Sequence, residues 1–287
     1  MKIHAVRTGT VRLKRRYVDA RWRRRPLRYL DVLAGRRWTA PLPVHAWAVE
    51  HPEGIIVVDT GATVACYDRS RHGVASRLIG TRAEWFDVAP EEEVGPGLRR
   101  LGLDPDAVRW VVTTHLAPEH VDGVPYFRNA EVVVARRELD ASSAVGIDPD
   151  WPSWVRLRPI DYDGPFGPFP ESYVLTEGVI LVATPGHTPG HQSVLCCDDD
   201  RAVFLAGDAT FSQAQLLEGG VGGIVHDGAA AATAVERIRA FARETPTVYL
   251  PSHDPEAPRR LRGRETVPLS PTGPAVASTA EPRPAGP

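Results

Sequence analysis

Apolar runs, alternating stretches and turn residues divide the chain into strands and helices. Residues 1–13, MKIHAVRTGTVRL, alternate with the period of two that is typical of a half-buried strand. VHAWAVE (44–50) and IIVVDTG (55–61) flank a HPEG turn, which predicts a β-hairpin. Four further apolar runs predict buried strands: VRWVVTT (108–114), VILVAT (179–184), AVFLAG (202–207) and TVYLPS (247–252).

Helices and loops are predicted between these strands. Residues 90–101 predict a helix with an acidic start, and residues 228–243 predict an alanine-rich helix capped by Asp227. DYDGPFGPFP (161–170) predicts a turn-rich loop, because its prolines and glycines disfavour a sheet. GGVGGIV (219–225) predicts a plain loop, because it lacks the final glycine of a dinucleotide-binding turn. Strands that mix with helices along the whole domain favour an α/β sandwich.

Length and composition favour one large domain and exclude several function classes. We assign residues 1–265 to the domain and expect the low-complexity residues 266–287 to be a disordered tail. A net charge of −2 favours neither nucleic acid nor a membrane surface as a partner. No apolar run approaches the ~20 residues of a membrane span, and the first residues lack an apolar signal core. The three cysteines show no disulfide framework, so we expect a cytoplasmic protein.

One segment near the N-terminus is rich in arginine. A patch that binds nucleic acid is one interpretation of this run. The other, which we favour, is a solvated loop used as a lid or a subunit contact, because acidic and apolar residues such as Tyr17 are interleaved with the cations. A homodimer therefore stays open as an assembly. The cationic residues are Arg12, Lys14, Arg15, Arg16, Arg21, Arg23, Arg24, Arg25, Arg28, Arg36 and Arg37.

Four of the predicted strands end in a side chain that can bind a metal ion. These side chains are those of His115, His187, Asp208 and His253. The loop THLAPEHVDG (114–123) adds His120, five residues after His115, and the carboxylate of Glu119. Imidazole and carboxylate groups are ligands of zinc, and a carboxylate can bridge two ions through its two oxygens. A single histidine after a strand is usually structural, but this repetition predicts a metal centre at the strand ends.

These motifs together resemble the metallo-β-lactamase superfamily, and within it the N-acyl-homoserine-lactone lactonases. The resemblance extends from RTGTVRLK through WAVEHPEGIIVVDTG, ATPGHTPGHQSVL and LAGDAT to YLPSHDPE. It implies an α/β fold, a four-layer αβ/βα sandwich. It also implies a centre of two metal ions, most often zinc, built around a His-x-His-x-Asp-His loop.

The resemblance assigns roles to individual positions. His115 and His120 match the first and last histidines of the family loop. The remaining matches to metal ligands are His187 in GHTPGH, Asp208 in AGDAT and His253 in PSHD. Asp59 of VVDTG matches an aspartate that supports the metal-binding loop without binding the metal itself. The alternative is that Asp59 is only a turn residue at the end of a strand.

Three positions depart from the family pattern. Ala117 replaces the middle histidine and cannot bind metal, while Glu119 replaces the aspartate and keeps its charge. Phe211 stands where these lactonases carry a tyrosine that hydrogen-bonds the substrate carbonyl. The first site then keeps three donors, His115, His187 and Asp208. The second keeps four, Glu119, His120, His253 and Asp208, so one zinc ion on that side is favoured over two.

The function implied is a metal-dependent hydrolase that opens a lactone or a related ester, with an acylated lactone as the expected small-molecule substrate. A metal-held hydroxide would attack the carbonyl, and Glu119 and Asp208 would be the catalytic carboxylates. The altered loop predicts reduced activity. The alternative is a catalytically silent homologue that binds a small ligand or a partner. We expect no metal-binding role for His191, Asp122 or His226, and a structural or surface role for His4, His45, His51 and His72.

Overall fold

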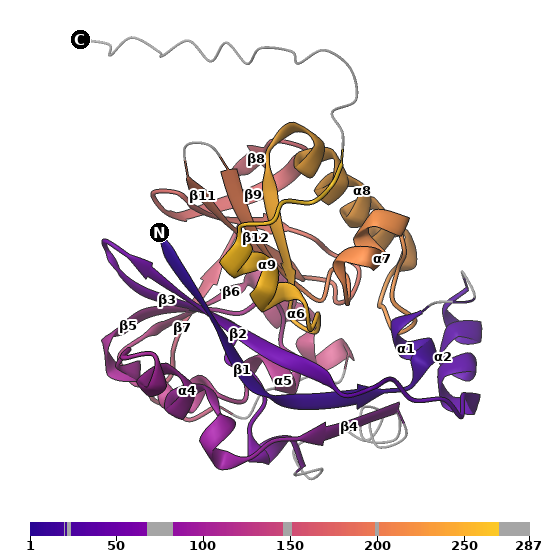
Figure 1. Ribbon diagram of the computed structural model, residues 1–287, viewed down its shortest axis with the longest axis horizontal. Coiled ribbons are helices and arrows are strands. Elements are labelled where there is room, and N and C mark those ends of the chain that lie inside the picture. The colour runs from indigo at the N-terminus through magenta and orange to yellow at the C-terminus, as the bar shows by residue number, and fades with distance from the viewer. Residues whose placement is uncertain (20, 22–23, 68–82, 146–150, 199–200, 270–287) are drawn as a thin grey trace.

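The protein is described by a computed structural model, in which residues 1–19, 21, 24–67, 83–145, 151–198 and 201–269 are placed. Two β-sheets lie face to face, and helices cover their outer sides (Figure 1). The first sheet has the strand order β4-β1-β2-β3-β5-β6-β7. Its strands are β1 (Lys2–Leu13), β2 (Leu42–His51), β3 (Gly54–Val58), β4 (Glu84–Asp87), β5 (Val108–Val112), β6 (Glu131–Ala135) and β7 (Arg156–Ile160).

The second sheet has the order β13-β12-β11-β10-β9-β8. Its strands are β8 (Gly164–Phe166), β9 (Phe169–Thr176), β10 (Val179–Ala183), β11 (Gln192–Asp198), β12 (Arg201–Gly207) and β13 (Thr247–Pro251). Strand β11 runs antiparallel to both β10 and β12, and β13 is parallel to β12. Strands β10, β12 and β13 therefore share one direction, and their carboxyl ends lie at the same edge of the sheet.

Helices occupy both outer faces and one end of the sandwich. They are α1 (Arg15–Val18), α2 (Arg25–Ala34), α4 (Val94–Arg100), α5 (Pro118–Val121), α6 (Arg136–Val145), α7 (Gln213–Glu218), α8 (Gly228–Glu244) and α9 (Ala257–Gly263). Short 3₁₀ turns lie at Val64–Tyr67, Pro90–Glu92, Pro105–Ala107 and Val124–Tyr126.

The buried side chains form layers that match this arrangement. One cluster, which includes Trp47 and Leu205, fills the space between the two sheets. A second packs Leu98 of α4 on the outer face of the first sheet, and a third packs Ile238 of α8 on the outer face of the second. The order helix, sheet, sheet, helix confirms the predicted four-layer αβ/βα sandwich.

Most predicted elements are present. The hairpin joins β2 to β3 with His51 opposite Gly54, and the four apolar runs form β5, β10, β12 and β13. Helix α8 begins where predicted, with Asp227 accepting hydrogen bonds from the amides of Ala229 and Ala230. The helix predicted over residues 90–101 is a 3₁₀ turn followed by the shorter α4.

The loop predicted over residues 161–170 is wrong. This stretch contains β8 and the start of β9, with Phe166 opposite Phe169. Strand β8 is the edge of its sheet, where Pro165 can be accommodated because one side of an edge strand needs no amide donor. Gly167 forms the turn with a φ of 53°, a left-handed conformation that glycine adopts without strain.

The two terminal segments also differ from expectation. The arginine-rich segment contains the helices α1 and α2 rather than a continuous loop, although most of its placed cations are exposed. Val267, assigned to the tail, is buried against the α8 side of the second sheet, and its amide donates to the carbonyl of Thr247. Folded structure thus continues past residue 265 to Leu269. The rest of the tail and His72 lie outside the described residues.

Among the placed helices, none combines the length and the apolar character needed to cross a bilayer.

Candidate metal centre

The strand ends bring the six predicted donor residues together. His115 follows β5, and Glu119 and His120 lie on α5 directly after it. His187, Asp208 and His253 follow β10, β12 and β13 at the edge of the second sheet. Two groups have donor atoms within 4.8 Å of one another: His115, His187 and Asp208, and Glu119, His120 and His253. Each group therefore combines residues from both halves of the chain.

Asp208 lies between the two groups. Its Oδ1 is 3.5 Å from the Nε2 of His120 and 3.4 Å from the Nε2 of His253, while its Oδ2 is 3.7 Å from the Nε2 of His187. Gly207 permits this approach, because a Cβ there would lie 2.7 Å from the Thr114 Cβ. One carboxylate thus faces both groups, as a bridging ligand requires.

The histidine rings are oriented by bonds on the sides that face away from the centre. Asp59 accepts from the His120 Nδ1 at 2.8 Å, and it also accepts from the amide and hydroxyl of Thr114. Its φ of 57° is left-handed, which aspartate tolerates better than most residues. The His253 Nδ1 donates to the carbonyl of Pro43 at 2.9 Å. Both bonds leave Nε2 as the unprotonated, metal-facing nitrogen in the neutral ring.

His191 is close to the centre, but both of its ring nitrogens make hydrogen bonds within the protein. Its Nε2 accepts a hydrogen bond from the amide of Asp208 at 3.0 Å, and its Nδ1 lies 2.9 Å from the hydroxyl of Thr184. Both ring nitrogens are therefore occupied, which agrees with the expectation that His191 binds no metal. It fixes the backbone that carries Asp208.

Several polar atoms of the donor groups are buried without a hydrogen-bond partner in the described part of the chain. They are His115 Nε2, His120 Nε2, His187 Nδ1 and Asp208 Oδ1. Burying an unpaired polar atom is costly, so such atoms are expected to meet a ligand. A set of imidazole nitrogens and carboxylate oxygens fits a divalent cation such as zinc.

The protonation of the metal-free site follows from these contacts. Burial alone would raise the pKa of Asp208, but His253, His120 and His187 more than offset it and hold that pKa well below its usual value. Burial would lower the pKa of His120, but Asp59 and Asp208 raise it to about 9. Burial and the neighbouring His120 and His187 hold the pKa of His115 well below normal.

Comparison with known proteins identifies the family of the chain. The model of the metallo-beta-lactamase superfamily matches residues 39–253. The chain belongs to this superfamily. The N-acyl homoserine lactonase AttM of Azorhizobium caulinodans is 27% identical over 228 residues, which cover 75% of this chain and 83% of the relative.

Two solved structures show the same fold. An N-acyl homoserine lactone hydrolase with the product N-hexanoyl-L-homoserine at its catalytic metal centre superposes with a TM-score of 0.69 at 22% identity, covering 90% of this chain and 95% of the other. The dizinc quorum-quenching lactonase AidC gives a TM-score of 0.61 at 14% identity, covering 88% and 87%.

The three positions that depart from the lactonase pattern are Ala117 and Glu119 in the loop and Phe211 after β12. Ala117 is the residue before α5, and its carbonyl accepts from the amide of His120, so the loop keeps a compact turn without a third histidine. Glu119 is buried, and burial raises the pKa of its carboxyl. The ring of Phe211 stacks on that of His253 with a centroid separation of 5.7 Å.

Sequence reasoning missed the residues that support this centre from distant segments. Glu138 is buried on α6 and accepts from the Thr188 hydroxyl and from the amides of Gly190 and Leu116. It thereby joins the GHTPGH turn to the His115 loop. No local pattern marks it, because all of its partners are more than twenty residues away.

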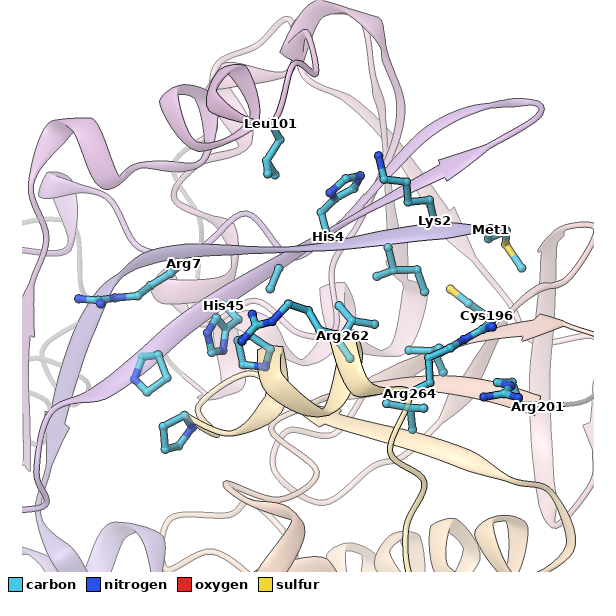
Figure 2. A pocket seen from close by; sticks show the side chains of 18 of the residues that line it. Met1, Lys2, His4, Arg7, His45, Leu101, Cys196, Arg201, Arg262 and Arg264 are labelled. Carbon is cyan, nitrogen blue, oxygen red and sulfur yellow. The ribbon is translucent and has the colours of Figure 1, made fainter.

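A separate groove lies behind the centre, between β1 and α9. It has a volume of about 820 Å³, and Arg7, His45 and Arg262 are among its lining residues (Figure 2). None of the six donor residues lines it. It approaches the centre at Pro43, whose carbonyl accepts from His253, and at His45, whose amide donates to the carbonyl of Ser252. We therefore place the reactive site at the strand ends and not in this groove.

Proposed function

We propose that this chain is a metal-dependent hydrolase that opens a lactone or a related ester, with an acylated homoserine lactone as the first substrate to test. The observation that carries the proposal is the pair of donor groups joined by Asp208. The relatives are named as N-acyl homoserine lactonases, and these names support a lactone as the substrate of this chain.

When bound, a metal ion at such a centre polarises a carbonyl oxygen and activates water. Asp208 would hold the two donor groups in a fixed relation, because each of its oxygens faces one of them. Glu119 is positioned to move a proton. Its buried carboxylate would take up a proton and deliver it to the leaving alkoxide.

We further propose zinc as the metal, bound more tightly by Glu119, His120, His253 and Asp208 than by the three donors His115, His187 and Asp208. The name of AidC describes it as a dizinc enzyme. In our chain Ala117 removes one nitrogen from the first group, so we propose a content nearer one ion than two. Elemental analysis after dialysis tests this stoichiometry, and two tightly held ions per chain would contradict it.

The activity is tested by ring opening of N-hexanoyl homoserine lactone with the zinc-loaded protein. We expect hydrolysis that a chelator removes and that Asp208→Asn lowers at least about 100-fold, because the variant loses a charged ligand shared by both groups. Asp161→Asn changes an exposed carboxylate and is the matched control. Hydrolysis that survives both the chelator and Asp208→Asn would refute the proposal.

The silent homologue, which Ala117 and Phe211 motivated, finds no support in the described structure or among the relatives. It requires that the zinc-loaded protein bind the lactone without opening it. The cytoplasmic location, the homodimer and the absence of nucleic-acid and membrane partners remain predictions from the sequence.

A further inference from the structure

The groove between β1 and α9 has the size of a ligand site (Figure 2). Its volume of about 820 Å³ lies within the range of pockets that hold small molecules, about 300–1,000 Å³. Strands β1 and β2 of the first sheet, strands β11, β12 and β13 of the second sheet, and helix α9 contribute its lining. Because no donor residue of the metal centre is among the lining residues, the groove is a separate site.

The floor of the groove is apolar. Ile3 and Ala5 of β1, Val203 of β12 and Leu261 of α9 line the groove, and all four pack against the core between the two sheets. These side chains are only partly buried, so part of their apolar surface faces the groove. A hydrocarbon chain that covered this floor would remove the surface from water, which is favourable. The floor therefore fits the apolar part of a ligand.

Positive charge predominates among the charged side chains that line the groove. Figure 2 shows Arg7 at one end of the groove, Arg201 at the other and Arg262 between them. Opposite charges attract across a binding surface, so this excess of cations complements an anion. The lining includes five cationic side chains and one carboxylate: Lys2, Arg7, Arg201, Arg262 and Arg264, and Asp198.

Arg262 is the cation of the groove that is best placed to receive an anion. Lys2 already pairs with Glu50 at 3.1 Å, and Arg264 pairs with Asp198 at 3.6 Å. Arg262, in contrast, has neither a hydrogen bond nor an ion pair to any residue that the structure describes. A guanidinium group can donate two parallel N–H bonds to one carboxylate, which is among the strongest hydrogen-bonded pairs in proteins. Its free donors therefore favour a carboxylate over other anions.

His45 adds a buried polar group to the wall of the groove. Its side chain is 3% exposed, and within the described residues its Nδ1 has no hydrogen-bond partner. The ring is held in place, because it packs against Trp47 with a centroid separation of 5.4 Å and because the His45 amide donates to the carbonyl of Ser252. An unpaired buried nitrogen is unfavourable and is expected to meet a ligand.

We propose that the groove between β1 and α9 is a second ligand site, which binds an alkyl carboxylate with its charge at Arg262 and its chain on the apolar floor. This inference does not depend on the proposed hydrolase function. A small anion without a chain would leave the floor in contact with water, and an uncharged chain would leave Arg262 without a partner. Only a ligand that joins the two parts satisfies both features of the groove.

The test is calorimetric titration of the zinc-loaded protein with octanoate. We expect one octanoate per chain, and at least about tenfold weaker binding of acetate, which lacks the chain, and of octanamide, which lacks the charge. Removing zinc with a chelator should change the Kd of octanoate less than about threefold, because no donor residue lines the groove.

Variants locate the bound octanoate. Arg262→Gln should raise its Kd at least about tenfold, because it removes the charged donor. Ala5→Phe should also raise it, because a larger side chain fills the floor. Arg259→Gln is the matched control, since Arg259 lies on the same helix outside the groove, and it should leave the Kd unchanged. Melting temperatures confirm that each variant is folded.

Four outcomes would overturn the inference. Octanoate binding that requires zinc would place the ligand at the metal centre. An equal rise of the Kd in Arg262→Gln and Arg259→Gln would show unspecific attraction to surface cations. Octanamide that binds as well as octanoate would remove the role of the charge, and the absence of any octanoate binding to the parent would remove the site. None of these outcomes affects the proposed hydrolase function, which is tested by ring opening.

Discussion

Replacing Asp59 by asparagine should weaken metal binding on the His120 side without disturbing the backbone. Asparagine tolerates the left-handed conformation of Asp59 and has the same shape. Its amide oxygen can keep the bond from the Thr114 amide, which is now 2.7 Å long. Its amide nitrogen, however, would face the His120 Nδ1 as a donor. His120 must then accept through Nδ1 and carry its proton on Nε2, the atom that the metal needs.

The expected loss is that of one supporting bond to a ligand, about 10- to 100-fold in metal affinity. This corresponds to about 1.4–2.7 kcal/mol. Competition with a chromophoric chelator at fixed pH measures the zinc affinity of the parent, Asp59→Asn and the control Asp161→Asn. Only Asp59→Asn should weaken binding, and only for the ion held by Glu119, His120 and His253. Unchanged affinity in Asp59→Asn would show that Asp59 does not set the tautomer of His120.

Three further predictions concern metal uptake and pH. Ala117→His should raise the zinc content per chain, because it supplies a nitrogen ligand to the group of His115, His187 and Asp208. Elemental analysis after dialysis measures the content. An unchanged content would show that the side chain of residue 117 does not reach this group. Zinc binding at pH 7 should release about one proton from His120, because the pKa of His120 is about 9 in the metal-free protein. Calorimetry in buffers of different ionisation enthalpy measures this release. A binding heat that does not depend on the buffer would contradict it. His45 should cost the metal-free protein stability as pH falls below about 6.5, because burial lowers its pKa to about 4. A folded-state pKa below the unfolded value gives stability that is present above pH 6.5 and lost toward the folded pKa, by up to about 1.4 kcal/mol per pH unit. Buried carboxyls with raised pKa values act in the opposite direction, so the share of His45 is measured by comparing urea unfolding of the parent and of His45→Asn from pH 7 to 4, and parallel profiles would refute it.

The candidate centre could be derived from the sequence because its signals are local. Each of the four apolar strands is followed within four residues by a metal-competent residue, and these residues converge in space. Asp227 could likewise be identified because a cap acts on the next two or three amides.

The parts that escaped prediction depend on tertiary pairing. Proline and glycine at residues 164–167 suggested a loop, and only the position of β8 at the sheet edge makes a strand acceptable there. Leu13 and Glu84 are 71 positions apart and meet through the pairing of β1 with β4, which no short motif records. Tyr17 looked like one apolar residue among arginines, because nothing nearby in the sequence indicates that its ring packs edge-on against Phe211.

The division of the donors between the two halves of the chain has a consequence for synthesis. His115, Glu119 and His120 leave the ribosome long before His253, and neither donor group draws all of its members from one half. A nascent chain that still lacks β13 cannot assemble the His253 group. An ion can therefore bind to the group of Glu119, His120 and His253 only after the two sheets have packed together. Once bound, the ion would stabilise the contact between the two sheets. A chain cut in the segment between β7 and β8 should then reassociate from its two fragments more tightly with zinc than without it.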